Sequence, residues 1–336
     1  MRNKSIALIY TGGTIGMTRT SNGYAPMADF PALLKDRLDR AGASLPQYVL
    51  HSFDRPIDSA NATPADWQAI AREIVARYDA HDGFVVLHGT DTMAFTAAAL
   101  SFMLQGLRKP VILTGAQIPL EEARSDALQN VVGALQLAAA GELSEVAIHF
   151  GQRLLRGNRS TKLDAEALIA FGSPNWPMLA DVGIDVRWNR AALLAPTAQE
   201  NFALPEYRAR VFSYRFSPGQ PLQALDALLA CRPDALILEC YGSGNAPERD
   251  PALGKMLARA HAAGVVLVAC SQCLSGNVHI GAYAAGAGMA TAGVVGAGDM
   301  RFEAVYAKLH HLFALGLAPD AVRAAMRRNL AGELTD

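Results

Sequence analysis

The feature that most constrains the fold is an alternation between short apolar runs and longer amphipathic runs. In the first half of the chain the apolar runs are SIALIY (5–10), QYVLHSF (47–53), GFVVLHG (83–89), PVILTG (110–115) and EVAIHF (145–150). Their length and composition are typical of strands in a sheet that is covered on both faces. The alternation predicts an α/β fold with a mostly parallel sheet and helices on both faces.

The segments between these runs have the periodicity of helices. In 63–78, apolar residues recur at the spacing of one helix face, and 124–140 repeats the pattern. Thr63 is a suitable N-cap because Pro64 follows it at the first helical position.

The chain has 336 residues, more than a single core usually holds. The alternation lapses in a stretch rich in Pro and Asn and then resumes. We therefore expect a larger N-terminal α/β catalytic domain at 1–185, a linker at 186–208 and a smaller C-terminal α/β domain at 209–336.

Charge and hydropathy argue against two classes of partner. The formal net charge of -1 provides no field that would attract nucleic acid or an anionic membrane. No stretch approaches the roughly 18 apolar residues of a membrane span, and the apolar run after MRNK is shorter than that of a secretory signal. A cytoplasmic location is the expectation.

The residues that usually hold metals or cofactors lack the necessary spacing. The Cys270–Cys273 pair has no second C-x-x-C or H-x-x-x-H beside it, so buried reduced thiols are expected for the four cysteines. The histidines show no metal spacing, and neither G-x-G-x-x-G nor a P-loop occurs. No metal and no cofactor are expected.

Three polar, glycine-bearing loops follow predicted strands: residues 11–14 (TGGT), 88–92 (HGTDT) and 114–119 (TGAQIP). Ligands of open parallel sheets bind beyond the carboxyl ends of the strands. One such loop is explained by turn geometry alone, whereas three together predict a pocket.

These loops and one later segment supply a possible reactive set. Thr90 and Asp91 lie in one loop, Thr14 in another, and Lys162 ends RGNRSTK (156–162). A threonine hydroxyl needs a neighbour that takes its proton, and Lys162 would serve only if its surroundings favoured the neutral amine. Thr14 would need another activator, such as Tyr24. Each residue alone is more often a turn, cap or surface residue, so the residues by themselves indicate only a hydrolase or lyase of a small polar substrate.

IYTGGTIGM (9–17) and VVLHGTDTMAFTAAALSFML (85–104) closely resemble the two signature motifs of bacterial L-asparaginases. The similarity continues through PIDSANATPADW, PVILTGAQIPL, RSDALQN, RGNRSTK, YGSGNAP and LAGELTD, and it covers essentially the whole chain. In its details the sequence is similar to the cytoplasmic, type I branch.

The resemblance implies hydrolysis of the side-chain amide of L-asparagine to L-aspartate and ammonia, without a cofactor. Thr14 matches the nucleophile of the first motif, assisted by Tyr24. Thr90, Asp91 and Lys162 match the second catalytic triad. Which threonine attacks first is left open, with Thr14 favoured.

The resemblance also implies substrate-binding residues. Ser59 matches the ligand of the α-carboxylate, and Asp91 matches the partner of the α-ammonium beside Thr90. Ala60 lies in the same binding loop, where many relatives carry a polar residue, so this part of the pocket is expected to be looser.

Two residues of the C-terminal half bear on assembly and regulation. Asn245 matches the residue that reaches a neighbouring subunit's site, which implies a homodimer or homotetramer. Glu239 stands where some type I relatives have a basic residue in an effector site, so regulation by asparagine is not expected.

Three alternatives remain open at this stage. One is a glutaminase-asparaginase of broader specificity, since one methylene is worth only about 10–200-fold in discrimination. A second is the misacylated-tRNA amide handled by a related archaeal amidotransferase subunit, which would call for an extra N-terminal domain and a basic surface. The third is a non-catalytic amino-acid sensor, which would not need the threonine and lysine set.

Overall fold

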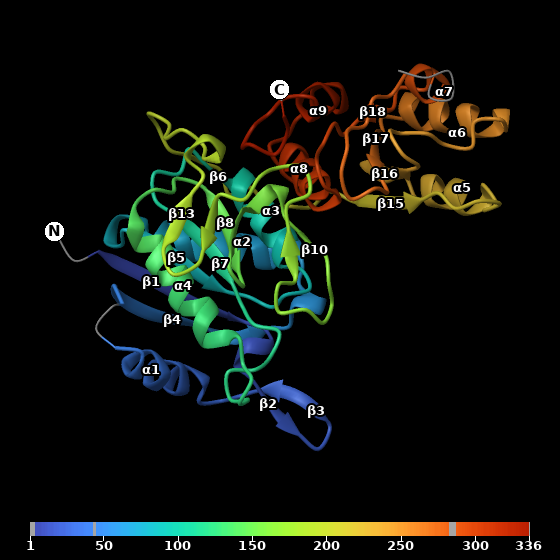
Figure 1. Ribbon diagram of the computed structural model, residues 1–336. Helices are drawn as coiled ribbons and strands as arrows, with labels where there is room; N and C mark the ends of the chain where they lie inside the picture. Colours follow the sequence, from blue (N-terminus) through green and yellow to red (C-terminus); the bar gives the residue numbers. More distant parts are fainter. Residues whose placement is uncertain (1–3, 43–44, 282–286, 336) are drawn as a thin grey trace. The chain divides into compact units, whose positions relative to one another are not determined.

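The computed structural model describes residues 4–42, 45–281 and 287–335 (Figure 1). The chain divides into two compact units, Met1–Leu204 and Pro205–Asp336. Each unit has its own sheet and its own hydrophobic core.

The N-terminal unit is built on an eight-stranded sheet in the order β13-β12-β9-β8-β7-β5-β1-β4. Strands β4, β1, β5, β7 and β8 are parallel, and β9, β12 and β13 continue the sheet antiparallel. The mostly parallel sheet is therefore confirmed. The strands are β1 (Ser5–Gly12), β4 (Gln47–Ile57), β5 (Gly83–Leu87), β7 (Val111–Thr114), β8 (Val146–Phe150), β9 (Arg153–Arg156), β12 (Ala180–Val182) and β13 (Val186–Trp188).

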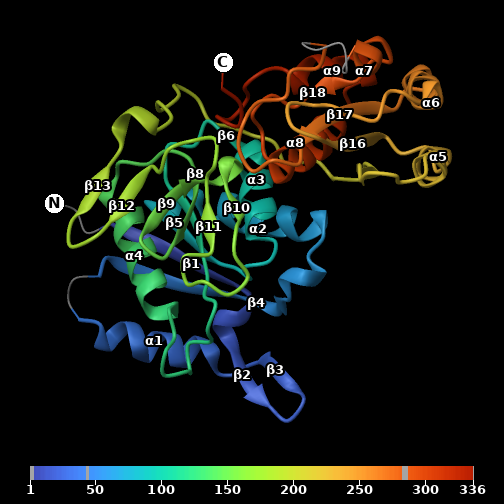
Figure 2. The ribbon, with the colours of Figure 1, turned by 45° about the vertical axis from the view of Figure 1, so that its right-hand side comes forward.

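Four helices cover this sheet: α1 (Phe30–Arg40), α2 (Pro64–Ala76), α3 (Met93–Met103) and α4 (Ala127–Ala140). Figure 2 shows α1 and α4 on one side of the strands and α2 on the other. Helix α2 begins as predicted, because the Thr63 backbone N–H donates to Asp66 Oδ2 at 2.7 Å.

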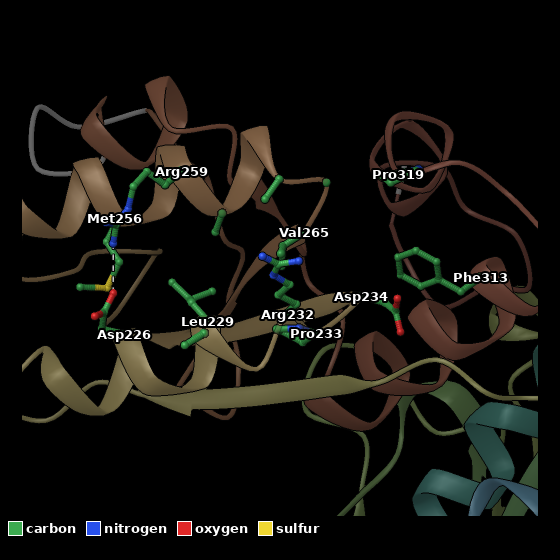
Figure 3. Close-up of a pocket in the computed structure, with 14 residues that line it drawn as sticks. Asp226, Leu229, Arg232, Pro233, Asp234, Met256, Arg259, Val265, Phe313 and Pro319 are labelled. Atoms are coloured by element: carbon green, nitrogen blue, oxygen red, sulfur yellow. Dashed lines mark hydrogen bonds and ion pairs between the residues drawn. The ribbon is translucent and has the colours of Figure 1, made fainter.

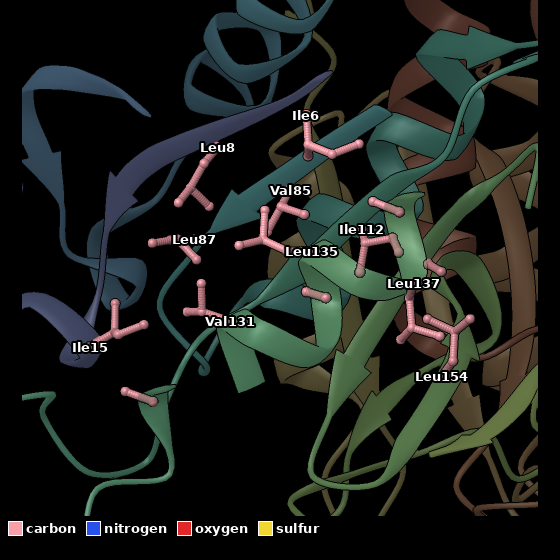
Figure 4. Packing of buried hydrophobic residues seen from close by; sticks show 14 of the residues in the cluster. Ile6, Leu8, Ile15, Val85, Leu87, Ile112, Val131, Leu135, Leu137 and Leu154 are labelled. Atoms are coloured by element: carbon pink, nitrogen blue, oxygen red, sulfur yellow. The ribbon is translucent and has the colours of Figure 1, made fainter. Parts of the chain in front are cut away.

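The core under α4 follows from the period of two along the strands. Ile6, Leu8, Val85 and Leu87 are fully buried and belong to one cluster with residues of α4, as Figure 4 shows. Alternate side chains of a strand point to opposite faces, so residues such as Ile9 point to the other face. Burial on both faces explains why these runs are apolar throughout.

Short elements complete the unit. The paired strands are β2 (Met17–Thr20) with β3 (Gly23–Pro26), β10 (Thr161–Lys162) with β11 (Phe171–Gly172), and β6 (Leu104–Gln105) with β14 (Asn201–Phe202). The 3-10 turns are η1 (Thr14–Gly16), η2 (Ser59–Asn61), η3 (Tyr78–Ala80), η4 (Gly157–Arg159) and η5 (Arg190–Ala192). Residues 186–208, expected to form a linker, begin with β13 of the large sheet and contain β14.

The C-terminal unit has a smaller parallel sheet in the order β15-β16-β17-β18, as expected for an α/β domain. Its strands are β15 (Val211–Arg215), β16 (Ala235–Cys240), β17 (Val266–Ser271) and β18 (Val295–Gly296). Its helices are α5 (Gln223–Ala230), α6 (Pro251–Ala262), α7 (Ala287–Thr291), α8 (Phe302–Ala314) and α9 (Pro319–Met326). A buried ion pair of 2.6 Å between Lys308 and Glu333 ties the end of the chain to α8.

In the described parts of the chain, none of the helices combines the length and the apolar character that crossing a bilayer requires.

Candidate active site

The site lies where β7, β5, β1 and β4 end side by side. These strands are neighbours and parallel, so the loops that follow them emerge at one edge of the sheet. Thr11, at the end of β1, donates its hydroxyl proton to the carbonyl of Leu87 on β5 at 2.8 Å. This hydrogen bond joins the loop after β1 to the loop after β5 at the point where both strands end.

Glycines bring the loops into backbone contact. A β-carbon on Gly12 would lie 2.3 Å from the Ile57 carbonyl oxygen, and one on Gly13 would lie 2.4 Å from the Gly89 nitrogen. A β-carbon on Gly89 would in turn lie 2.4 Å from Ser59 Oγ. No residue with a side chain fits at these points, so the glycines of TGGT and HGT set the spacing between three loops.

Thr90, Asp91 and Lys162 meet as the sequence predicted. Lys162 Nζ lies 2.8 Å from Thr90 Oγ1 and 2.8 Å from Asp91 Oδ1. Thr90 is buried, whereas the Asp91 side chain is 62% exposed and that of Lys162 is 20% exposed. The cluster thus opens to solvent on the carboxylate side. An ammonium donates to both partners here, and Lys162 could accept a proton from Thr90 only after losing one itself.

Gln117, which nothing in the sequence singles out, completes the surroundings of Thr90. Its Oε1 accepts from Thr90 Oγ1 at 3.2 Å, and its Nε2 donates to the carbonyls of Ala165 and Ala167, both at 3.1 Å. Its own backbone N–H lies 3.1 Å from each carboxylate oxygen of the buried Asp126, at the start of α4. The hydrogen bonds to Asp126 therefore fix the backbone from which the Gln117 side chain extends.

Thr14 begins η1 on the neighbouring loop and is partly buried. The Leu120 N–H donates to the Ile15 carbonyl at 3.1 Å, which ties this turn to the loop after β7. Among the residues that the structure describes, none forms a hydrogen bond with the Thr14 hydroxyl. That hydroxyl is consequently available to a ligand.

Tyr24, the expected activator of Thr14, lies on the β2–β3 hairpin and is 49% exposed. Its hydroxyl donates to Glu122 Oε1 at 3.1 Å. This hydrogen bond, followed by a small desolvation and the negative charge of Glu122, raises the pKa of the Tyr24 phenol. In this arrangement the Tyr24 hydroxyl is bound to Glu122.

Ser59 lies at the start of η2 and is buried beside the Thr90 loop. Thr92 donates its hydroxyl proton to the Ser59 carbonyl at 2.8 Å. Ala60 follows with its side chain exposed, and its N–H donates to Asp58 Oδ1 at 3.2 Å. The Thr92 contact fixes the predicted carboxylate-binding loop against the Thr90 loop, and the Asp58 contact closes its own turn.

The remaining predicted residues belong to the C-terminal unit. Asn245 closes a turn after β16 through two backbone hydrogen bonds with Tyr241, of 2.8 and 2.9 Å. Glu239 pairs with Arg215 across adjacent strands at 3.3 Å. The local charge at Glu239 is therefore balanced within this sheet.

The thiols differ from the prediction in part. Cys240 and Cys270 are free and buried, and burial raises the pKa of both to about 12. Cys231 and Cys273 are also free, but they are exposed, because they follow the ends of α5 and β17. The expectation of four buried thiols was wrong for these two.

The C-terminal unit also has a groove of about 750 Å³ between α5 and α6 (Figure 3). Arg259 of α6 pairs with Asp226 of α5 at 3.0 Å on one side of it. The groove contains none of the predicted site residues. In the described segments no three His, Cys, Asp or Glu side chains are grouped as metal ligands would be.

Fold and site together define a two-unit α/β protein with two threonine hydroxyls, a lysine and an aspartate at the carboxyl edge of its larger sheet. The chain matches the family described as "Asparaginase, N-terminal" over residues 5–194 and "Glutaminase/Asparaginase C-terminal domain" over residues 210–326. It therefore belongs to the asparaginase family.

Individual relatives agree with this assignment. The chain is 44% identical to L-asparaginase 1 of Escherichia coli K12 over 338 residues, covering 100% of this chain and 99% of that protein. Its fold is similar to the crystal structure of L-asparaginase I from Vibrio cholerae, with a TM-score of 0.91, 40% identity and 99% of each chain covered. The thermostable L-asparaginase from Thermococcus kodakarensis gives a TM-score of 0.89 at 32% identity, again with 99% of each chain covered.

Proposed function

We propose that this protein is an L-asparaginase, which hydrolyses the side-chain amide of L-asparagine to L-aspartate and ammonia. The observation that carries the proposal is the bridge that Lys162 forms between Thr90 and Asp91. It lies in a chain that is 44% identical to an L-asparaginase over its full length. The cluster carries a charged carboxylate on its solvent-exposed side, which suits a small zwitterionic substrate.

In the proposed mechanism the Thr14 hydroxyl attacks the amide carbon. The C–N bond breaks, and the hydroxyl proton leaves with ammonia, so that aspartate remains as an ester on Thr14. Water, positioned by a hydrogen bond to the Thr90 oxygen beside Lys162, then hydrolyses the ester: its oxygen bonds to the acyl carbon, the bond to the Thr14 oxygen breaks, and the water proton returns to that oxygen. The Thr14 hydroxyl, which has no hydrogen-bond partner among the described residues, supports the first step, and the position of Thr90 beside Lys162 supports the second.

Substrate recognition follows from the same geometry. Lys162 donates a hydrogen bond to Oδ1 of Asp91, and Oδ2 of Asp91 would accept one from the α-ammonium of the substrate. Ser59, with nearby backbone N–H groups, would bind the α-carboxylate. Donors fixed where negative charge develops on the amide oxygen are worth about 10²–10³-fold in rate each.

The proposal is tested by ammonia release from asparagine with the purified protein, in the presence of a chelator and without nucleotide. Wild type should turn over, and Thr14→Ala should lower kcat by about 10³-fold or more. Thr197→Ala, at an exposed loop threonine, is the matched control and should keep wild-type kcat. An undiminished rate in Thr14→Ala would remove Thr14 from the mechanism.

A broader glutaminase-asparaginase activity is the second candidate, because the C-terminal match carries both names. The ratio of kcat/KM for asparagine and glutamine decides between them. We further propose a cytoplasmic homodimer or homotetramer in which Asn245 completes a neighbouring subunit's site. Light scattering gives the assembly state, and Asn245→Ala should raise KM for asparagine more than it lowers kcat.

A further inference from the structure

The orientation of the Gln117 amide is fixed by its partners. Nε2 donates to two backbone carbonyls, those of Ala165 and Ala167, which uses both amide protons. A carbonyl oxygen can only accept a hydrogen bond, so the other end of the amide, toward Thr90, must be the oxygen. The contact between Gln117 Oε1 and Thr90 Oγ1 at 3.2 Å therefore uses the threonine proton.

Thr90 has a single proton and two lone pairs. Its proton points to Gln117, and one lone pair accepts from the Lys162 ammonium at 2.8 Å. After these two hydrogen bonds, only the second lone pair of the Thr90 hydroxyl can still take part in a hydrogen bond. Thr90 can consequently offer a ligand an acceptor, but no donor, while Gln117 is in place.

We propose that Gln117 is a positioning residue that orients the Thr90 hydroxyl as a hydrogen-bond acceptor toward water or the substrate amide. The inference rests on the proposed asparaginase function. It adds a second role: the same amide ties residues 165–167 to the site, and these follow Lys162 closely in the chain. Asp126 fixes the Gln117 backbone, so the side chain acts from a rigid support.

Gln117→Met and Gln117→Glu separate this role from a merely structural one. Gln117→Met keeps the length but loses all three hydrogen bonds, and kcat should fall by about 10- to 100-fold. In Gln117→Glu an ionised carboxylate repels the two carbonyl oxygens, whereas the protonated acid again has an acceptor for Thr90 and a donor for one carbonyl.

The charged and titratable groups around position 117 are Asp126, Lys162, Asp91 and the Asp164 side chain, which accepts from the Ala167 N–H. They are common to all the variants, so activities are expressed relative to wild type at each pH. The relative kcat of Gln117→Glu should rise by about tenfold between about pH 8 and about pH 5 as the carboxyl is protonated. That of Gln117→Met should stay constant.

Gln272 is the matched control, since its Nε2 also donates to two backbone carbonyls, those of Phe216 and Glu239, both at 2.8 Å. Gln272→Met and Gln272→Glu should have wild-type relative kcat at every pH. Wild-type kcat in Gln117→Met, or a flat relative profile in Gln117→Glu, would overturn the proposal.

Amide hydrogen exchange distinguishes a failure of the proposed asparaginase function from a failure of the proposed role of Gln117. Amides of residues 163–170 should exchange faster in Gln117→Met than in wild type or Gln272→Met, whatever the substrate is. If wild type released no ammonia, the proposed function would fail while this measurement still tested the Gln117 tether. Unchanged exchange in Gln117→Met would contradict the tether.

Discussion

Gly13 lies directly against Gly89: a β-carbon on Gly13 would be 2.4 Å from the Gly89 nitrogen. The two residues belong to the loops after β1 and β5, which carry Thr14 and Thr90 respectively. Gly13 also has a φ of +90°, a conformation that side chains disfavour. The distance between the Thr14 loop and the Thr90 loop is therefore set by the backbone contact between Gly13 and Gly89.

Gly13→Ala should separate these loops. The added methyl group must displace the backbone of Gly89, and a misplacement of about 1 Å at a catalytic group costs on the order of 10²-fold in rate. We expect kcat/KM for asparagine to fall by about that factor, measured by ammonia release. Gly254→Ala is the control, because Gly254 lies in helix α6 and a β-carbon added there would meet no atom outside the adjoining helix backbone within 4 Å.

The control should behave in the opposite way. Alanine in a helix interior is more stable than glycine by about 0.5–1 kcal/mol, so Gly254→Ala should keep full activity and raise the unfolding midpoint slightly. Equal activity in Gly13→Ala and Gly254→Ala would show that the close approach at Gly13 does not matter for function.

Lys162→Met removes the cation that bridges Thr90 and Asp91. Proton transfer by a positioned side chain contributes about 10²–10⁴-fold, and we expect a loss of kcat in that range. Lys35→Met is a matched control, since Lys35 pairs with Asp39 at 2.6 Å on the exposed surface of α1. Steady-state kinetics that give the same kcat for both variants would refute the role of Lys162.

Glu122→Gln should lower the pKa of Tyr24. The Glu122 carboxylate accepts a hydrogen bond from the phenol and repels the phenolate, and both effects hold the pKa of Tyr24 above its ordinary value. Ultraviolet absorbance titration of wild type, Glu122→Gln and Tyr24→Phe isolates this tyrosine. Identical titration of wild type and Glu122→Gln would mean that the hydrogen bond is absent in solution.

His149 should make stability depend on acid pH. Burial lowers its pKa from 6.5 to about 4. The unfolded chain therefore binds a proton between these values that the native protein does not. Above about pH 6.5 His149 is neutral in both the folded and the unfolded chain, so it does not change the free energy of unfolding. As the pH drops below about 6.5, this free energy falls, by up to about 3 kcal/mol near pH 4.

His149→Gln tests this linkage. Glutamine can still donate to the Arg153 carbonyl, which lies 3.1 Å from His149 Nδ1, but it does not titrate. Denaturant unfolding at several pH values should show a slope shallower by up to about 1.4 kcal/mol per pH unit in this window. His310 and His311, whose pKa values are also lowered to about 4 by burial, leave a residual slope in the variant. An unchanged slope would contradict the assignment.

The sequence indicates the central strands because each is apolar throughout, and it indicates the start of α2 through Thr63. It does not indicate β12 and β13, which have three residues each and form only by pairing with β9 and with each other. Their composition carries no period of its own. Tertiary pairing, rather than local preference, decides such strands.

The site shows the same division. Thr90, Asp91 and Lys162 stand out because of their chemistry, and the structure brings them together. Gln117 does not stand out, since a single glutamine after a strand has no distinguishing pattern. Its importance comes from contacts with residues 48 and 50 positions later in the chain. The sequence marks TGGT only as one of three polar, glycine-bearing loops, and the structure gives its glycines a packing role between loops.

The most direct test of the account is a crystal structure with bound L-aspartate. We predict that its side-chain carboxylate accepts a hydrogen bond from the Thr14 hydroxyl and is in van der Waals contact with Thr90, with the α-ammonium on Asp91 and the α-carboxylate at Ser59. Aspartate bound elsewhere, or touching only one of the two threonines, would contradict the claim that these loops form one active site.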